Sequence, residues 1–389
     1  MNNFSFYNPT KIAFGEGQIS AITDLIPANA RILITYGGGS IKKNGVYEQV
    51  IKALEGKTFF EFAGIEPNPH YETCLKAIAL IKEKNIDFLL AVGGGSVVDA
   101  TKLIAAGVNF VGETADAEPW DILAKSAPVT SALPIGCILT LPATGTESNG
   151  NSVVTKFATH EKLAFSSPLV YPLFSILDPA TTYSLPPRQI SNGVVDAFVH
   201  IMEQYLTYPA DAKVQDRFAE GLLLTLIEEG PKILAQPNDY AIRANVMWAA
   251  TMALNGLIGV GVPQDWATHM IGHELTAMHG LDHAQTLAIV LPSVMNQQRE
   301  QKRAKLIQYG KRVWNLSNVN DDDLIDAAIA ATKSFFEQMG VPTTFKGYGL
   351  DGSSIPALVD NVIRHNPNPL GEHGDITVEV TRKILQAAA

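Results

Sequence analysis

Cysteine is scarce in this sequence, with only Cys74 and Cys137 among 389 residues. Two isolated thiols supply neither a disulfide framework nor the paired spacing of a cysteine-rich zinc site. Apolar runs such as FLLAV at 88–92 are also far shorter than the ~20 residues that a membrane-spanning helix needs. The first residues, MNNFSFYNPTKIAFG, lack a basic start followed by an apolar stretch, so we expect no signal peptide. These absences predict a cytoplasmic protein without a membrane partner.

Positive charge is the next shortage. The chain has 29 Lys and Arg against 39 Asp and Glu, for a net charge of −10. Nucleic-acid binding depends on clustered Lys and Arg that contact phosphates, so we expect no nucleic-acid partner. A length of 389 residues with 46% hydrophobic residues instead predicts a globular protein of two domains.

Strand patterns are confined to the first half of the chain. Residues 1–184 alternate short apolar runs with helix-like segments, as a parallel α/β sheet requires. The expected strands are 31–36, 58–62, 88–92, 137–141 and 173–178. From 185 onward the pattern predicts only amphipathic helices, at 191–207, 211–234, 240–258, 264–278, 299–313, 322–339, 353–364 and 375–388. We therefore predict an α/β domain over 1–184 and an all-helical domain over 185–389, divided near SLPPRQ, where Pro186 and Pro187 interrupt regular structure.

A glycine loop follows the expected strand at 88–92. It reads GGGS, and the helix expected after it begins near Ser96. Such a loop lets backbone N–H groups approach a diphosphate at the positive end of a helix, which predicts a Rossmann-like dinucleotide site at Gly94, Gly95 and Ser96. The loop does not have the GxGxxG fingerprint, and a structural turn is the alternative.

The loop after the first expected strand, TYGGGSIKKNG, contains Gly38, Gly39 and Ser40 but no carboxylate. An acidic residue near this place would bind the ribose 2′-hydroxyl of NAD(H) and repel a 2′-phosphate. A hydroxyl followed by Lys42 and Lys43 instead favours NADP(H), unless these lysines are ordinary solvated residues.

A third loop, TLPATGTES at 140–148, is rich in hydroxyl groups. Thr140, Thr144 and Thr146 are candidates to bind a ribose or the nicotinamide amide. Composition alone marks the loop only as a turn.

Asp196 and His200 are spaced i, i+4 in NGVVDAFVHIMEQYL, so a helix places both side chains on one face. Four further histidines lie within fifteen residues: His269, His273, His279 and His283. A carboxylate with imidazoles suits Zn²⁺ or Fe²⁺. The spacing does not decide which of the four later histidines complete such a site.

The segments ILDPATTYSLPPRQISNGVVDAFVHIMEQ and GGGSVVDATK resemble the first signature and the pyrophosphate loop of the iron-containing, or group III metal-dependent, alcohol dehydrogenases. The resemblance covers essentially the whole chain. Within that family the chain is similar to bacterial broad-range NADPH-dependent aldehyde reductases, also known as NADPH-dependent butanol dehydrogenases. The resemblance implies a dehydroquinate synthase-like architecture, an active site in the cleft between the domains, and a homodimer.

The resemblance also selects a ligand set. It implies that Asp196, His200, His269 and His283 hold one divalent metal, with zinc favoured over iron. His273 would lie near the nicotinamide and substrate, as a candidate proton relay, whereas His279 receives no role. Ala284 follows the last of these ligands where many members have glycine.

Further cofactor positions come from the same resemblance. Gly95, Ser96, Asp99, Asn68 and Lys162 match family positions that bind the dinucleotide. Members that prefer NAD carry Asp in the first glycine loop, so Ser40 agrees with NADPH.

These observations predict an oxidoreductase that reduces small aldehydes to primary alcohols, reversibly. The metal would polarise the carbonyl group while NADPH gives hydride. One alternative is an NAD-linked polyol or diol dehydrogenase, against which Ser40 argues. Another is a metal- and nucleotide-binding regulator without catalytic activity, although a site without thiolates is unlike a typical structural zinc site.

Overall fold

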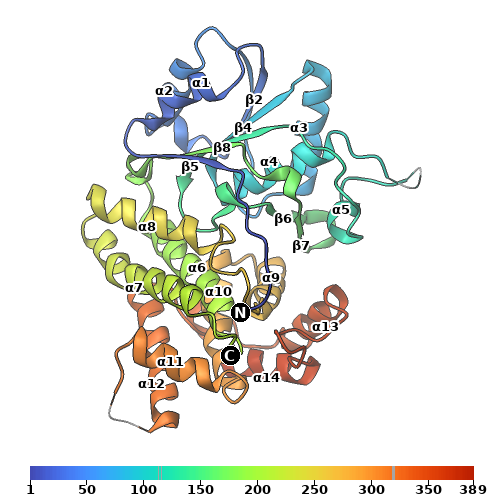
Figure 1. Ribbon diagram of the computed structural model, residues 1–389. Coiled ribbons are helices and arrows are strands. Elements are labelled where there is room, and N and C mark those ends of the chain that lie inside the picture. The colour runs from blue at the N-terminus through green and yellow to red at the C-terminus, as the bar shows by residue number, and fades with distance from the viewer. Residues whose placement is uncertain (113, 115, 318–319) are drawn as a thin grey trace. The chain divides into compact units, whose positions relative to one another are not determined.

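A computed structural model describes residues 1–112, 114, 116–317 and 320–389 of the chain. Its contacts divide the chain into two compact units (Figure 1). The α/β unit consists of Tyr7–Pro186 and Pro237–Met247. The helical unit consists of Met1–Phe6, Pro187–Gln236 and Trp248–Ala389.

A six-stranded parallel sheet forms the centre of the α/β unit, in the order β1-β8-β5-β4-β2-β3. All five expected strands are confirmed. The sheet comprises β1 (Lys11–Phe14), β2 (Arg31–Thr35), β3 (Thr58–Phe62), β4 (Phe88–Gly94), β5 (Ile135–Leu141) and β8 (Phe174–Leu177). The sequence did not predict β1, a four-residue edge strand too short to show a clear pattern. It also did not predict the antiparallel pair β6 (Asn151–Lys156) and β7 (Glu161–Ser166).

Helices cover both faces of the sheet (Figure 1). Alternate residues of a strand point to opposite faces, so each strand contributes to two cores. In β2, Ile32 and Ile34 pack with α1 (Ile22–Leu25) and α2 (Val46–Ala53), whereas Leu33 packs with α3 (Tyr71–Lys84) and α4 (Gly95–Gly107). Burial on both faces explains why these strands are almost wholly apolar.

The helical unit is built from long helices, as the sequence predicted. They are α6 (Pro187–Tyr205), α7 (Lys213–Ala235), the end of α8 (Tyr240–Ala253), α9 (Ala267–His279), α10 (His283–Gln297), α11 (Arg303–Arg312), α12 (Asp321–Gln338), α13 (Ile355–His365) and α14 (Val378–Ala388). Among the described residues, no helix is both long and apolar enough to cross a bilayer.

Helix α8 ends five residues before the expected bound, and α11 begins four residues after it. Helices α6 and α10 also differ from expectation. Helix α6 begins at Pro187 itself, because a proline at the first helical position loses no hydrogen bond. Helix α10 was not predicted at all. Nearly all of its residues after the first turn are buried, so its sequence has no polar face and hence no amphipathic period.

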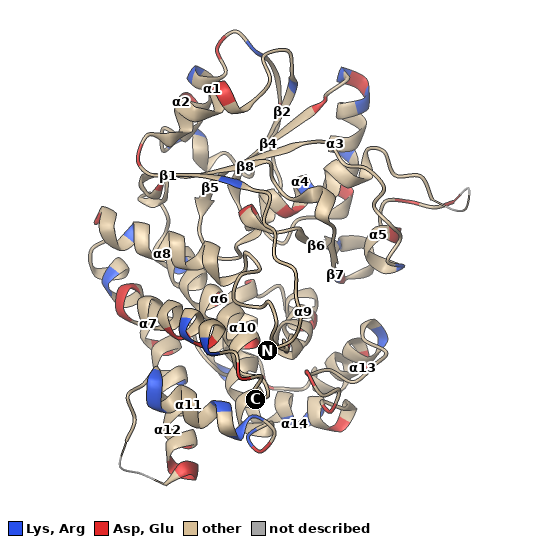
Figure 2. Cartoon of the chain, viewed as in Figure 1, with Lys and Arg blue, Asp and Glu red and all other residues tan. Residues whose placement is uncertain are grey.

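Lys and Arg are interspersed with Asp and Glu in the view of Figure 2. Helix α12 and the residues at and just before the start of α11 illustrate the pattern. Arg303 lies 2.7 Å from Asp322, and Arg299 lies 2.6 Å from Asp326. Paired charges of this kind are typical of a solvated surface rather than of a basic surface for nucleic acid.

Candidate metal centre and cofactor loops

Helix α6 carries the first half of the candidate metal centre. Asp196 and His200 lie one turn apart on its buried face. The helix is apolar around them, with Val195, Ala197 and Val199 fully buried. Both polar side chains are therefore held inside the helical unit, where an unpaired carboxylate would be costly.

Helices α9 and α10 supply the other half. His269 is the third residue of α9, and His283 is the first residue of α10. The start of α10 is fixed by Asp282, which caps the helix. Asp282 also accepts hydrogen bonds from Arg188 at 2.8 Å and Asn192 at 2.7 Å, both on α6. The two halves of the centre are thus tied together beside the histidines.

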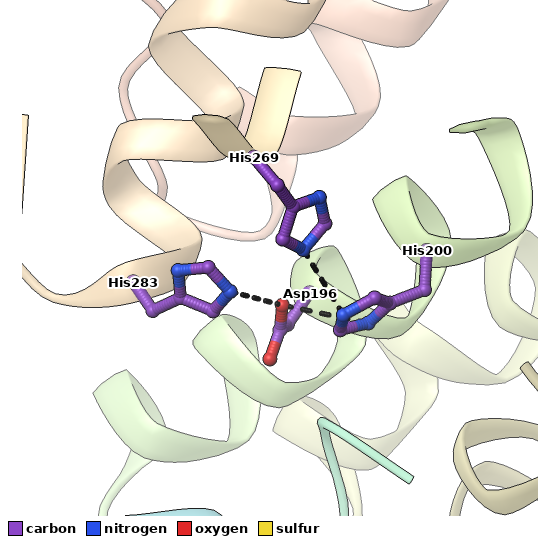
Figure 3. A group of neighbouring side chains, drawn as sticks. All are labelled: Asp196, His200, His269 and His283. Atoms are coloured by element: carbon purple, nitrogen blue, oxygen red, sulfur yellow. Dashed lines mark hydrogen bonds and ion pairs between the residues drawn. The ribbon is translucent and has the colours of Figure 1, made fainter. Parts of the chain in front are cut away.

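The donor atoms of the four candidate ligands lie close together. Each offers a donor atom, and these atoms all lie within 4.8 Å of one another. Figure 3 shows the rings of His200, His269 and His283 around the Asp196 carboxylate. Nε2 of His200 lies 3.0 Å from Nε2 of His269, and Nε2 of His283 lies 3.6 Å from Oδ1 of Asp196.

These separations fit a single metal ion. Zinc bonds to nitrogen and oxygen are about 2.0–2.1 Å long, so tetrahedral ligands stand about 3.3 Å apart. The measured separations of 3.0 and 3.6 Å lie on either side of that value. Zn²⁺ and Fe²⁺ both accept three imidazoles and a carboxylate, so the donor set can hold either ion.

The protonation of His200 also fits metal binding. Burial holds the pKa of His200 well below its usual range, and the neighbouring His269 lowers it further. The ring is therefore neutral at physiological pH. A neutral imidazole is the form that coordinates a metal.

Glu203 adjoins this centre and was not among the predicted site residues. Its carboxyl group contacts Nδ1 of His269 and accepts a hydrogen bond from the His269 backbone N–H at 3.2 Å. Burial raises the pKa of Glu203 well above its usual range, and nearby Asp265 raises it further. The sequence held a signal for this residue, because Asp196, His200 and Glu203 are spaced i, i+4, i+7 on one helix face.

The two remaining histidines of the cluster lie in different places. His273 is buried beside the centre, with its ring centroid 6.2 Å from that of His269 and 5.6 Å from that of His283. His279, at the end of α9, instead lies 2.9 Å from the hydroxyl of Ser354. The structure thus gathers His269, His283 and His273 and separates His279 from them.

In the α/β unit, the second glycine loop along the chain, GGGS at 93–96, joins β4 to α4 at Gly94 and Gly95. A Cβ atom on Gly94 would lie 2.9 Å from Cβ of Leu141, and one on Gly95 would lie 2.7 Å from Oγ1 of Thr144. Both distances are too short for any side chain. Glycine is needed here because the 140–148 loop packs directly against the loop, with Ser96 in the first turn of α4 that follows.

Asp99 on α4 is bound within the protein. Its carboxylate accepts a hydrogen bond from Thr146 at 2.5 Å and from the backbone N–H of Val153 at 3.0 Å. Asp99 and Thr146, both predicted cofactor residues, therefore hold one another. Thr140, near the end of β5, is also buried.

Lys102, one turn beyond Asp99 on α4, was not among the site residues predicted from the sequence. It is fully buried, and burial lowers the pKa of its ammonium group to about 8. Its Nζ, which carries three N–H donors, lies between 2.6 and 3.1 Å from five acceptor oxygens on Thr146, Asn149 and Asn151. This side chain organises the segment that follows the third loop. The i, i+3 spacing from Asp99 was the only signal for it in the sequence.

The first glycine loop leads from β2 into a short 3-10 helix, Ser40–Lys42. Gly39 has φ +91°, a conformation that side-chain-bearing residues rarely adopt, while Gly38 has open space around it. The loop itself lacks a carboxylate, but Glu61 of β3 reaches Lys42 at 3.0 Å. Sequence reasoning missed this contact because Glu61 is distant in the chain.

Asn68 and Lys162, both predicted to bind the cofactor, lie next to each other. Nζ of Lys162 donates to Oδ1 of Asn68 at 2.9 Å. Asn68 has φ +53°, in the left-handed region that asparagine tolerates better than most residues.

Comparison with known proteins covers both units. Residues 9–179 match the family "Iron-containing alcohol dehydrogenase", and residues 190–389 match "Fe-containing alcohol dehydrogenase family, C-terminal". The chain is 61% identical, over 389 residues and all of both chains, to the NADPH-dependent aldehyde reductase YqhD of Escherichia coli. The crystal structure of E. coli YqhD matches with a TM-score of 0.98, covering 100% of this chain and 99% of that one.

A second relative bears a different cofactor in its name. The chain is 39% identical, over 393 residues and all of both chains, to the probable NADH-dependent butanol dehydrogenase 1 of Bacillus subtilis. Matches that span both units at these identities establish common descent. The chain belongs to the iron-containing alcohol dehydrogenase family.

Proposed function

We propose that this protein reduces aldehydes to primary alcohols with NADPH, and catalyses the reverse reaction with NADP⁺. The observation that carries the proposal is the cluster of Asp196, His200, His269 and His283, of which the first three are buried and His283 is partly buried, with donor atoms within 4.8 Å of one another. The name of the E. coli relative, an NADPH-dependent aldehyde reductase, supports the same chemistry.

Asp196, His200, His269 and His283 would hold one divalent metal. When bound, such a metal polarises a carbonyl group, and NADPH supplies hydride to the carbonyl carbon. Burial of Asp196, His200 and His269 limits the competition of bulk water with the carbonyl oxygen. His273, buried one helical turn after His269, would pass a proton to the product oxygen.

The α/β unit would bind NADPH through three groups of residues. The backbone N–H groups of Gly94, Gly95 and Ser96 at the start of α4 would bind the diphosphate. In the first loop, Gly38, Gly39 and Ser40 would receive the 2′-phosphate, with the lysines that follow. The third group would either contact the dinucleotide or position residues that contact it. It consists of Thr140, Thr144, Thr146, Asp99, Asn68 and Lys162.

Zinc is the metal that we propose, although the family name points to iron. Either ion would act without a change of oxidation state, so both are compatible with hydride transfer. Elemental analysis of protein purified without chelators distinguishes them. One equivalent of iron and no zinc would correct this part of the proposal.

We also propose a homodimer in the cytoplasm. Strand β1 lies at one edge of the sheet, where edge strands often pair with another chain, and Phe14 on it and Leu173 beside it are 38% and 54% exposed. The buried free thiols of Cys74 and Cys137 agree with a reducing compartment. Light scattering of the purified protein tests the dimer.

One assay tests the central proposal. NADPH absorbance is followed with butanal, then again after chelation and after zinc is restored. We expect activity that chelation abolishes and zinc returns. The NAD-linked polyol alternative predicts instead that glycerol or a diol is oxidised faster with NAD⁺ than butanal is reduced with NADPH. Inactivity of the metal-loaded protein on a broad aldehyde panel would favour the regulator.

A further inference from the structure

The side chain of Glu203 contacts one candidate ligand, His269, at two places. Its carboxyl group contacts Nδ1 of the His269 ring and accepts the His269 backbone N–H at 3.2 Å. One residue thereby fixes both the position of the backbone and the orientation of the ring. The side chain of Glu203 is 3% exposed, so water does not compete for either contact.

The contact with Nδ1 determines what the other ring nitrogen can do. A neutral imidazole carries one proton, and a carboxyl oxygen that accepts at Nδ1 favours the tautomer with the proton on that nitrogen. Nε2 then presents a lone pair. In the structure, Nε2 of His269 points to the other ligands and lies 3.0 Å from Nε2 of His200.

A buried charge network holds the neighbouring chain in place. The backbone N–H of Asp265 donates to the backbone carbonyl of Glu203 at 2.8 Å, and its side chain accepts the Ala267 N–H at 2.8 Å where α9 begins. Lys302, 3% exposed, lies 2.8 Å from Asp265 and 2.6 Å from Glu372. The turn that starts α9, and with it His269, is therefore anchored to α6.

We propose that Glu203 is a positioning residue for metal binding: it orients His269 and keeps Nε2 of that ring available to a divalent cation. The inference rests on the proposed metal site and adds to it a residue outside the ligand set. Partners of this kind raise the metal affinity of the ligand they contact, typically by 10–100-fold.

The test is a zinc titration of metal-free protein in competition with a chromogenic chelator, so that no enzyme activity is needed. Glu203→Gln keeps the shape of the side chain and removes its charge. We expect the zinc affinity to fall by about 10–100-fold. Glu203→Asp retains a carboxylate and should bind zinc more tightly than the Gln variant does. If the Gln variant does not fold by circular dichroism, the Asp variant compared with wild type still reports the effect of moving the carboxylate.

Glu274→Gln is the matched control. Like Glu203, Glu274 is a buried carboxylate that contacts an imidazole. It is on α9 and lies 2.7 Å from Nδ1 of His365. We expect this variant to bind zinc as tightly as wild type. Undiminished zinc affinity in both Glu203 variants, or an equal loss in Glu274→Gln, overturns the inference. Failure of the wild-type protein to bind any metal would instead overturn the proposed function.

Discussion

The ammonium group of Lys42 lies 3.0 Å from the Glu61 carboxylate and is 4.4 Å from the centre of the Tyr47 ring and 5.1 Å from that of Tyr36. Both tyrosines also donate to Glu61, each at 2.6 Å. Lys42 is thus held in one place beside the first glycine loop. Lys43, the next residue, has no comparable setting among the described contacts.

This difference predicts unequal roles for the two lysines. Lys42→Ala should raise the KM for NADPH about 10-fold or more, because a hydrogen bond to a charged group contributes about 1.5–3 kcal/mol. The KM for NADH, which has no 2′-phosphate, should change little. Lys43→Ala should raise the KM for NADPH much less than Lys42→Ala does, and steady-state kinetics with both cofactors measures the two effects. Equal losses with NADPH and NADH would show that Lys42 does not bind the phosphate.

Ser40 offers a second test of cofactor choice. Ser40→Asp places a carboxylate where the 2′-phosphate is proposed to lie, and should favour a ribose 2′-hydroxyl instead. We expect the ratio of kcat/KM for NADPH to that for NADH to fall by at least about 10-fold, as one lost charge-assisted contact would produce. Ser40→Ala, without the added charge, should alter that ratio far less. An unchanged ratio in the Asp variant would place the phosphate elsewhere.

His273 separates catalysis from metal binding. His273→Ala removes the proposed proton relay, so kcat should fall by about 100-fold or more. The four ligands remain, and metal content by elemental analysis should stay at the wild-type level. His283→Ala, which removes a proposed ligand, should lose the metal. A metal-free His273→Ala protein would make this histidine a ligand.

The elements of both units could be predicted where the local pattern is strong. Asp196 and His200 share a face of α6 because helical spacing alone puts them there. Helix α10 was missed for the opposite reason, since a helix buried on all sides shows no period. The partners of His269 could not be found locally, because Glu203 reaches it from another helix 66 residues away in the chain. The family resemblance, not the spacing, selected His269 and His283.

Lys102 was likewise not predicted from the sequence, because its partners lie on another segment of the chain. Its contacts lead to a prediction about stability. Lys102→Met approximately keeps the length of the side chain but removes the ammonium group that lies within hydrogen-bonding distance of five acceptor oxygens. We expect a loss of about 3–5 kcal/mol in the free energy of unfolding at pH 7, because several buried acceptors lose their donor at about 1–3 kcal/mol each. Urea unfolding of the NADPH-free protein measures it. An unchanged midpoint and slope would contradict the role assigned to this ammonium group.

The pH dependence of that loss has a definite sign. Burial lowers the pKa of Lys102 to about 8 in the folded protein, whereas the unfolded chain has the usual value near 10.4. Between these values the unfolded chain binds more protons, so this group makes the wild type more stable as pH rises. The difference in stability between wild type and Lys102→Met should therefore widen from pH 8 to pH 10. A difference that narrows would mean that the folded pKa is not lowered.

The α/β unit is completed by a segment far along the chain. Residues 237–247 belong to it, and Met247 lies fully buried in one of its two cores. A ribosome must therefore synthesise α6 and α7 of the helical unit before the last piece of the nucleotide-binding unit emerges. A fragment that stops at Pro186 lacks this piece, and we expect it to aggregate or to be degraded. The α/β unit can therefore be completed only after part of the helical unit has been synthesised. A single cut in the chain would not release either unit as an intact domain.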